Sequence, residues 1–327
     1  MTDPRLPERL ALAPHHLVLS RGPGSCQVGT GPDRARVLDG LSPGLLAMLD
    51  RLMSGPCPVA TLLDLAGPRG PAAGLLVALR TDGLLTDPDA GRRARSSSLV
   101  VVRGDGPLAV AVALGLARAG VGLVYPRVTG TAGSDDVAAG LPRRDAGRDR
   151  GPALARLLAA ECPDTRTGPP GSASPDLVLL TGAAAAPEPG DVVEHLPVTL
   201  RDGRGVVGPL VLPGRSPCLR CVERTRTDRD PGWPLIAAQL ATHPPTAAPH
   251  TVTATAGLAV GQALAALEGP ARGDPAPASL GALLELDPHT AAITVRTWTV
   301  HPACRCGAPR PAATGTHTGR TRRAELR

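Results

Sequence analysis

The chain has 327 residues, 42% of them apolar, and a formal net charge of +6. It contains neither lysine nor asparagine, which excludes a lysine Schiff base and the lysine clamp of a P-loop. Tyr125, Trp233 and Trp298 are its only aromatic residues, so the body of the chain lacks the stacking platforms and the basic stripe of a specific nucleic-acid-binding protein.

The cellular compartment follows from what the sequence lacks. No N-terminal apolar run resembles a signal peptide, and no stretch reaches the ~20 apolar residues of a membrane span. We therefore expect a cytoplasmic protein without membrane contact. In that reducing compartment, paired cysteines favour a metal over disulfides. The isolated Cys26, Cys57 and Cys162 are expected to be small buried residues rather than reactive groups.

Residues 1–95 are predicted to form a small, winged-helix-like α+β domain. Two short strands, HHLVLSRG and SCQVGTG, are separated by a Gly/Pro turn. Three short helices follow, and the first, SPGLLAMLDRLMSG, begins at a serine cap and has leucines at helical spacing. A peptide-recognition module and an appendage of the main domain both fit this order. The polar stretch PDAGRRARSSS (88–98) is predicted to be a linker.

The segment 99–125 predicts the βαβ opening of a Rossmann-like, doubly wound α/β domain. An apolar strand leads into the turn GDGPLA, and glycines in such a turn let a phosphate approach the start of the next helix. Gly104 and Gly106 are therefore the candidate nucleotide-binding residues. Asp105 places a negative charge in the same turn, and Pro107 removes an amide donor. Both features weaken a nucleotide site.

A dinucleotide-binding protein carries an acid after its second strand to hold a ribose. Tyr125, Pro126 and Arg127 occupy that place here. Asp135 and Asp136 follow later, in a glycine-rich loop, where we expect them to face solvent. Since no hydride-transfer residues are evident either, a dinucleotide-dependent oxidoreductase is the weakest of the function classes considered.

The elements that follow complete an α/β domain. They are the helix GPALARLLAAECPDT, the buried parallel strand PDLVLLTG, the hairpin HLPVTLRDGRGVVGPLVLPG, the helices WPLIAAQLATH and TVTATAGLAVGQALAALEG, and the closing hairpin LGALLELDPHTAAITVRTWTVHP. His243 and His250 lie in the Pro-rich stretch THPPTAAPH, where exposed histidines are expected rather than catalytic ones. Trp233 is expected to anchor the loop after the first cysteine pair.

Four cysteines occur in two tight pairs, each beside a proline. Cys218 and Cys221 form a C-x-x-C turn, and Cys304 and Cys306 form a C-x-C turn far downstream. Four thiolates satisfy tetrahedral zinc and leave no open position, so the pairs predict a structural zinc site. The alternative is a set of unrelated thiols or a redox dithiol, but a redox C-x-x-C does not account for a second pair.

Taken in this order, the parts resemble the ThiF/MoeB/HesA superfamily of ubiquitin-activating-enzyme-like adenylyltransferases. The resemblance covers residues 96–307 and is carried mainly by GPLVLPGRSPCLRC and HPACRCG. The stretch RDGRGVVGPLVLPGRSPCLRCVERTRTDRDPGWP is especially similar to actinobacterial ThiF-family or leader-peptide-binding proteins of azole-forming peptide pathways. In that subgroup the N-terminal unit resembles a winged-helix element that recognises precursor peptides.

The resemblance implies ATP·Mg binding and adenylation of the C-terminal glycine of a carrier protein. The family pattern also needs an acid after the second strand, an Asn-x-x-Arg stretch, a phosphate-binding lysine and a metal-binding aspartate after a later strand. This chain has no asparagine or lysine, and Thr181 and Gly182 stand where that aspartate is expected. The arginines that could replace the lysine are Arg127, Arg143, Arg144 and Arg148.

We therefore expect a retained fold whose ATP·Mg chemistry is largely lost, with no catalytic residues assigned. The expected role is to bind a precursor peptide and present it to a cyclodehydratase-like partner enzyme. The alternative is an active adenylyltransferase. A homodimer is compatible with this fold. The last segment, 308–327, is rich in arginine and is expected to be a disordered basic tail.

Overall fold

The computed structural model describes residues 6–14, 16–31, 35–67, 69–182, 193–243, 246–272 and 274–310. The chain divides into two compact units. The first comprises residues 1–98, 120–123 and 261–277, and the second comprises the remainder. Within the described residues, no helix combines the length and the apolar character that a membrane crossing requires. Most of the segment predicted as a basic tail, residues 311–327, lies outside the described residues.

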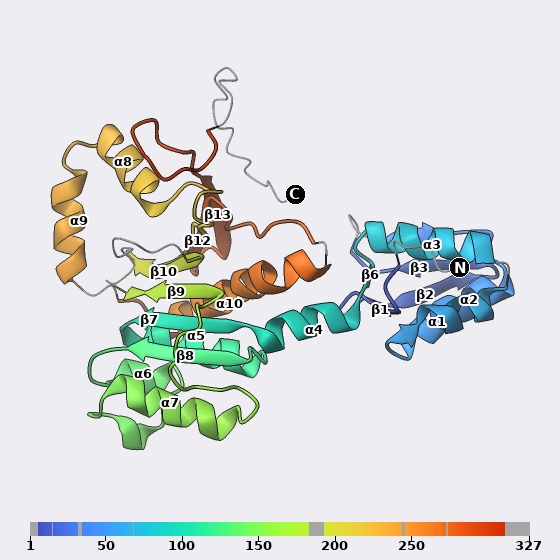
Figure 1. Ribbon diagram of the computed structural model, residues 1–327, viewed down its shortest axis with the longest axis horizontal. Helices are drawn as coiled ribbons and strands as arrows, with labels where there is room; N and C mark the ends of the chain where they lie inside the picture. Colours follow the sequence, from blue (N-terminus) through green and yellow to red (C-terminus); the bar gives the residue numbers. More distant parts are fainter. Residues whose placement is uncertain are drawn as a thin grey trace. The chain divides into compact units, whose positions relative to one another are not determined.

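The first unit is built from short strands and three packed helices (Figure 1). Strand β1 lies between β5 and β6, and β2, β3 and β4 form a second antiparallel sheet. The elements are β1 (Arg9–Leu12), β2 (Val18–Gly22), β3 (Ser25–Val28), β4 (Arg36–Leu38), α1 (Pro43–Met53), β5 (Cys57–Pro58), α2 (Val59–Ala66), α3 (Arg69–Thr81), β6 (Leu85–Thr86) and α4 (Pro88–Ser97). The two strands and three helices expected from the sequence are thus present.

Helical leucine spacing builds the core of the first unit. Ser42 accepts a hydrogen bond from the Leu45 amide and so caps α1, as its position before Pro43 predicts. The apolar faces of α1, α2 and α3 then meet over β1, and the residues that this buries include Leu10, Met48, Leu49, Leu62 and Leu76. Strands β1, β4, β5 and β6 are too short to show an alternating pattern and were not expected.

The segment 88–98, expected to be a linker, is instead helical over α4. Asp87 caps the helix by accepting hydrogen bonds from the amides of Asp89 and Ala90. Arg95 is 2.6 Å from Glu268 in the last turns of α10, which belong to the same unit. The composition indicated a solvated segment because Glu268, whose carboxylate pairs with Arg95, is remote in sequence.

The second unit contains a mixed seven-stranded sheet in the order β13-β12-β11-β10-β9-β7-β8 (Figure 1). Strands β7, β9 and β10 are parallel, and β10 to β13 form an antiparallel meander. From residue 99 the elements are β7 (Leu99–Gly104), α5 (Gly106–Arg118), β8 (Leu123–Val128), α6 (Ser134–Ala138), a 3-10 turn (Arg143–Asp145), α7 (Arg150–Glu161), β9 (Leu177–Thr181), β10 (His195–Arg201), β11 (Arg204–Val207), α8 (Leu219–Arg229), α9 (Trp233–Thr242), α10 (Pro249–Arg272), β12 (Ala282–Asp287) and β13 (Ala292–Thr297).

This architecture confirms the α/β class. The continuous apolar runs of β7 and β9 are buried on both faces, as parallel strands require. The two expected hairpins are the pairs β10–β11 and β12–β13. The parallel strands bring the glycine turn after β7 and the end of β9 to one edge of the sheet. The hairpins deliver the two cysteine pairs.

Candidate metal centre and glycine turn

The four paired cysteines come together in the second unit. The Sγ atom of Cys218 is 3.8 Å from that of Cys221 and 3.7 Å from that of Cys304, and the Sγ atoms of Cys221 and Cys306 are 3.7 Å apart. All four Sγ atoms lie within 4.8 Å of one another. A tetrahedron with zinc–sulfur bonds of about 2.3 Å has edges of about 3.8 Å. The cluster therefore has the donor set and the spacing to bind a metal ion.

Local backbone structure positions these thiols. Cys218 is the N-cap of α8, and the Cys221 amide donates to its carbonyl oxygen at 2.9 Å, which turns both side chains to one side. On the other pair, the Cys304 amide donates to the His301 carbonyl oxygen at 2.9 Å. His301 Nδ1 accepts from the Ala303 amide, and its Nε2 donates to Asp228 of α8 at 2.7 Å. The His301–Asp228 contact thus links the two cysteine-bearing segments directly.

The surroundings of the thiols act on their pKa values in opposite directions. Burial raises the pKa of Cys221 to about 12. Burial also acts to raise the pKa of Cys306, but hydrogen bonds from the Ala308 amide and the neighbouring thiols lower it overall. Burial raises the pKa of Cys218 as well. A bound cation would offset the cost of burying thiolates, and its binding would release the protons that burial otherwise retains.

The glycine turn after β7 is closely packed. Gly104 has φ +136, and a Cβ atom there would collide with the carbonyl and hydroxyl oxygens of Thr181 at the end of β9. The Thr129 amide donates to the Gly104 carbonyl oxygen at 3.0 Å. A Cβ atom at Gly182 would collide with the Asp105 carboxylate. Asp105 thus lies over the strand end where the resemblance places a metal-binding aspartate.

Replacing Gly104 by alanine is expected to destabilise the second unit. The collision with Thr181 adds to the strain of a positive φ, for a total of about 2–3 kcal/mol. Gly106 is the matched control, because its φ is +74 and nothing lies within 4 Å of a Cβ atom there. Its alanine variant should therefore lose only about 1–2 kcal/mol of backbone strain. Urea denaturation of both variants measures the difference, and equal losses would contradict the close packing of Gly104.

Asp136 does not face solvent, in contrast to the expectation from its glycine-rich loop. Its side chain is 3% exposed and accepts from Arg150 Nε at 2.7 Å and from the Gly133 amide at 2.7 Å. Arg150 also donates to the carbonyl oxygens of Thr129 and Thr131. Asp135 is exposed, as expected. The loop after β8 is therefore held by a buried ion pair.

Sequence reasoning missed Arg150, whose only signal was its position at the start of a predicted helix. The four arginines considered as lysine substitutes lie elsewhere. Arg127 is exposed on β8, Arg143 and Arg144 lie in the 3-10 turn, and Arg148 is 63% exposed and 3.9 Å from Asp145. The guanidinium group of Arg150, in contrast, is hydrogen-bonded to the Asp136 carboxylate and to two backbone carbonyl oxygens.

The remaining candidates from the sequence are three isolated cysteines, two histidines and Trp233. Cys26, Cys57 and Cys162 are buried, and burial raises the pKa of Cys26 and Cys162, as suits inert thiols. His243 and His250 are exposed. Trp233 Nε1 donates to Glu223 of α8 at 2.5 Å, which ties the start of α9 to the helix that begins at Cys218.

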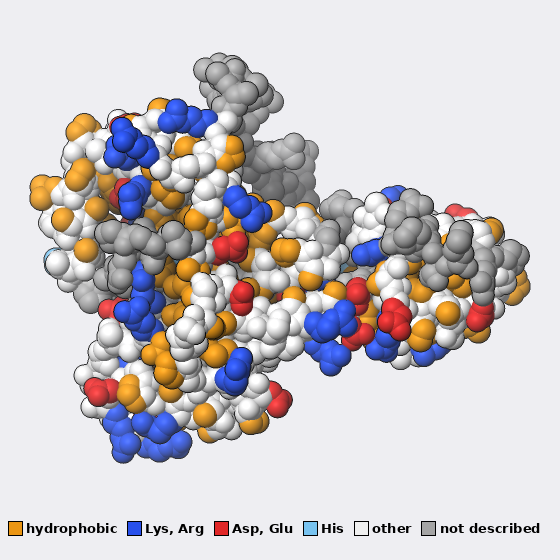
Figure 2. Space-filling model, viewed as in Figure 1, with side chains coloured by type: hydrophobic (Ala, Val, Ile, Leu, Met, Phe, Trp, Pro, Cys, Tyr) orange, Lys and Arg blue, Asp and Glu red, His pale blue; other side chains and the backbone are white. Residues whose placement is uncertain are grey.

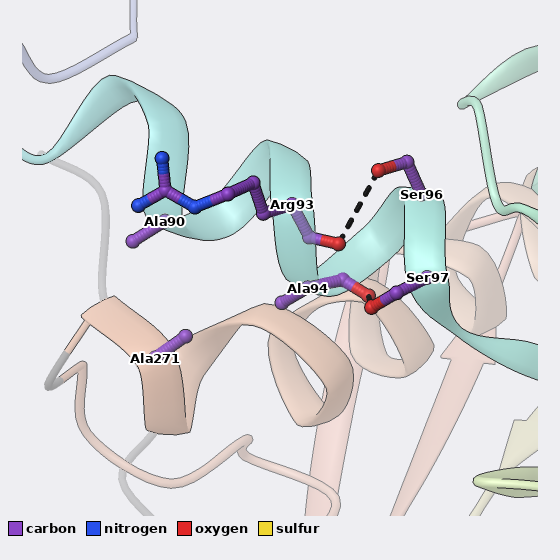
Figure 3. Close-up of a pocket in the computed structure, with 6 residues that line it drawn as sticks. All are labelled: Ala90, Arg93, Ala94, Ser96, Ser97 and Ala271. Atoms are coloured by element: carbon purple, nitrogen blue, oxygen red, sulfur yellow. Dashed lines mark hydrogen bonds between the residues drawn. The ribbon is translucent and has the colours of Figure 1, made fainter.

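A shallow depression of about 550 Å³ lies in the first unit, between α4 and the end of α10 (Figure 3). Ser96 and Ser97 line it, but their hydroxyls donate to carbonyl oxygens of α4. Arg93 is the only charged residue in its lining, and the others are Ala90, Ala94 and Ala271. Without an acid, histidine or cysteine, this lining offers no group for proton transfer or metal binding.

No family model matches the chain, and no curated protein matches its sequence. Among solved structures, it is similar to Escherichia coli MccB with ATP, at a TM-score of 0.65 and 14% identity over 91% of this chain and 99% of that one. It is also similar to the microcin C7 biosynthetic enzyme MccB in complex with N-formylated MccA, at 0.64 and 15% over 92% of this chain and 100% of that one. For PaaA the values are 0.52 and 14%, over 73% of this chain and 96% of that one. The chain therefore has a fold similar to that of MccB.

Proposed function

We propose that this protein is a ThiF-like, zinc-stapled scaffold that binds a precursor peptide and presents it to a partner enzyme in peptide natural-product maturation. We further propose that its own ATP·Mg chemistry is largely lost, that it belongs with the actinobacterial leader-peptide-binding subgroup, and that its partner is cyclodehydratase-like. A homodimer is compatible with this role.

The observation that carries the proposal is the similarity in fold to MccB over nearly the whole of both chains, including the N-terminal unit. MccB has been solved with MccA and with N-formylated MccA, so that protein takes a peptide. Similarity over residues of both units supports a peptide as the ligand here. The remaining question is whether the peptide is adenylated or only held.

The packing of the sheet edge supports loss of adenylation. Phosphoryl and nucleotidyl transfer need cations, a metal or several amide donors around the polyphosphate. Here Asp105 places a carboxylate in the glycine turn, Gly182 replaces the metal-binding aspartate, and Arg150 is bound to Asp136. Gly104 and Gly106 remain the only residues that match a nucleotide-binding turn.

The proposed metal is zinc at Cys218, Cys221, Cys304 and Cys306. Four thiolates suit tetrahedral zinc, and a site with four protein ligands has no position for a substrate or water. The ion would hold α8 to the chain after β13. This role is structural.

The first unit supplies a surface suited to a peptide, and we propose residues 1–95 as a winged-helix-like peptide-recognition domain. Leu19, Gln27 and Val37 are aligned across β2, β3 and β4. Leu17, Leu19 and Val37 are exposed, whereas Cys26 and Val28 face the core. Exposed apolar side chains on either side of a glutamine, on one face of a small sheet, suit a docking surface for a peptide.

Fluorescence anisotropy with labelled precursor peptides encoded beside this gene tests the proposal. We expect saturable binding that Leu19→Asp weakens about tenfold, since it places a charge in an apolar contact. Ile293→Asp is the matched control, because Ile293 is also an exposed apolar residue, on β13 in the second unit. No binding by any such peptide, or equal losses in the two variants, would refute the assignment.

The second candidate is an active adenylyltransferase, favoured by the similarity to MccB solved with ATP and with AMPCPP. ATP–pyrophosphate exchange in the presence of the peptide, or of a carrier protein ending in glycine, separates the two. The scaffold proposal expects exchange at the background of a protein-free mixture. Robust exchange would establish the second candidate instead.

A further inference from the structure

The second unit holds an arginine cluster around Trp298 that neither the cysteine centre nor the glycine turn explains. Trp298 follows β13 and is half-buried. Its Nε1–H group is buried and has no hydrogen-bond partner in the described part of the chain. Buried N–H groups are nearly always paired, and an indole N–H can only donate. What this atom requires is an acceptor.

Two guanidinium groups lie against that indole. The Cζ atoms of Arg226 and Arg229 of α8 lie 5.5 Å and 5.8 Å from its ring centroid. The Trp298 amide donates to Gly281 and so extends the ladder of β13, which places Arg296 on the same side of the chain as Trp298. Basic side chains are seen to gather over α8 in Figure 2. The cluster thus combines an unused donor with concentrated positive charge.

Carboxylates offset this charge only in part. Arg226 is 2.9 Å from Glu223, but Arg296 is 3.6 Å from Glu285, which binds Arg204 more closely at 2.9 Å. In the described ranges, no carboxylate lies within 4.0 Å of Arg229, and this side chain is exposed. Burial, together with the positive charge of Arg201 and Arg296, lowers the pKa of Arg226 against the opposing charge of Glu223.

We propose that Trp298, Arg229 and Arg296 form a binding site for an oxyanion, either a carboxylate or a phosphate group of a ligand. The Nε1–H group donates one hydrogen bond to it, and the two guanidinium forks supply charge-assisted ones. Arg226 is already engaged, because its Cζ atom also lies 4.8 Å from the Trp233 ring centroid and its guanidinium pairs with Glu223. Arg229 swings off the indole to admit the ligand. This site does not depend on the peptide-binding proposal.

The two tryptophans of the chain both lie in this cluster, so intrinsic fluorescence reports on it directly. The variant Trp233→Phe keeps an aromatic ring against Arg226 and leaves Trp298 as the only tryptophan, which excitation at the red edge of the absorption band separates from Tyr125. Titration with inorganic phosphate and, separately, with citrate is compared with potassium chloride at equal ionic strength. We expect a saturable change in emission with at least one of the two oxyanions. The stronger ligand identifies the preferred chemistry.

Binding should weaken about tenfold in Arg229→Gln and in Arg296→Gln, because each removes a charge-assisted hydrogen bond. Arg118→Gln is the matched control, since Arg118 is an exposed arginine of the same unit that pairs with Glu161 away from the cluster. Isothermal titration calorimetry of the unmodified chain and of Trp298→Phe repeats the measurement without the Trp233 substitution. Oxyanion effects no larger than those of chloride, or losses equal to that of Arg118→Gln, would overturn the proposal.

Discussion

Replacing Cys221 by serine is expected to abolish stoichiometric zinc binding and to lower the thermal midpoint of the protein by about 10 °C or more. The physical reason is the closed geometry of the centre. Its four thiols lie within 4.8 Å of one another, and tetrahedral zinc would use all four, so the cluster has no spare thiol to replace Cys221. Structural zinc contributes binding energy that is also folding energy, and here it would join two segments remote in sequence. Elemental analysis and differential scanning calorimetry on the purified chain measure both effects.

Cys162→Ser provides the control for that experiment. Cys162 is also buried, but it follows α7 and is not among the four clustered thiols. Its variant should keep the metal and lose little stability. If Cys221→Ser retained full zinc content, or if the unmodified protein carried no metal, the proposed centre would be wrong. Loss of zinc in Cys162→Ser would show that the assay reports unfolding rather than a lost ligand.

Replacing Asp136 by alanine is expected to lower the free energy of unfolding by about 3–5 kcal/mol, a drop of roughly 6–20 °C in midpoint. The substitution leaves the Arg150 guanidinium, whose side chain is 11% exposed, without its carboxylate partner. It also removes the acceptor of the Gly133 amide. An unpaired buried charge is far more destabilising than a missing surface pair.

The adjacent Asp135 gives a matched control in the same loop. It carries the same charge one residue earlier, but its side chain is exposed. Asp135→Ala should therefore change the free energy of unfolding by less than about 0.5 kcal/mol. Urea denaturation compares the two variants directly. Similar losses in both would mean that the loop is sensitive to any substitution, and the account of the buried pair would fail.

Asp135 and Asp136 show that a local sequence pattern does not predict which side chain is buried. Both occur in a glycine-rich, polar stretch, and nothing in their neighbours distinguishes them. Burial separates them because Arg150, at the start of α7, approaches from another part of the chain. Helix α4 shows the same limit. Its polar, arginine-rich sequence is typical of a solvated linker, but Glu268 of α10 provides the counter-charge that allows it to pack.

The contacts of Trp298, in the proposed oxyanion site, are likewise not predictable from the sequence. The sequence identifies it as one of only two tryptophans, but neither its unpaired Nε1–H nor the stacking of Arg226 and Arg229 follows from the sequence order. These depend on α8 and the end of β13 meeting in space. The position of Asp105 over Gly182 likewise requires the parallel pairing of β7 with β9.

By itself, the sequence determined the features that local chemistry controls. The two cysteine pairs, the serine cap of α1, the apolar runs of β7 and β9 and the glycines of the turn each follow from a few adjacent residues. The tertiary structure alone decided which charged side chains are buried, which strand ends are crowded and which donors have no partner. The physical reason is that desolvation and charge pairing depend on distances between residues far apart in the chain, and no local pattern encodes those distances.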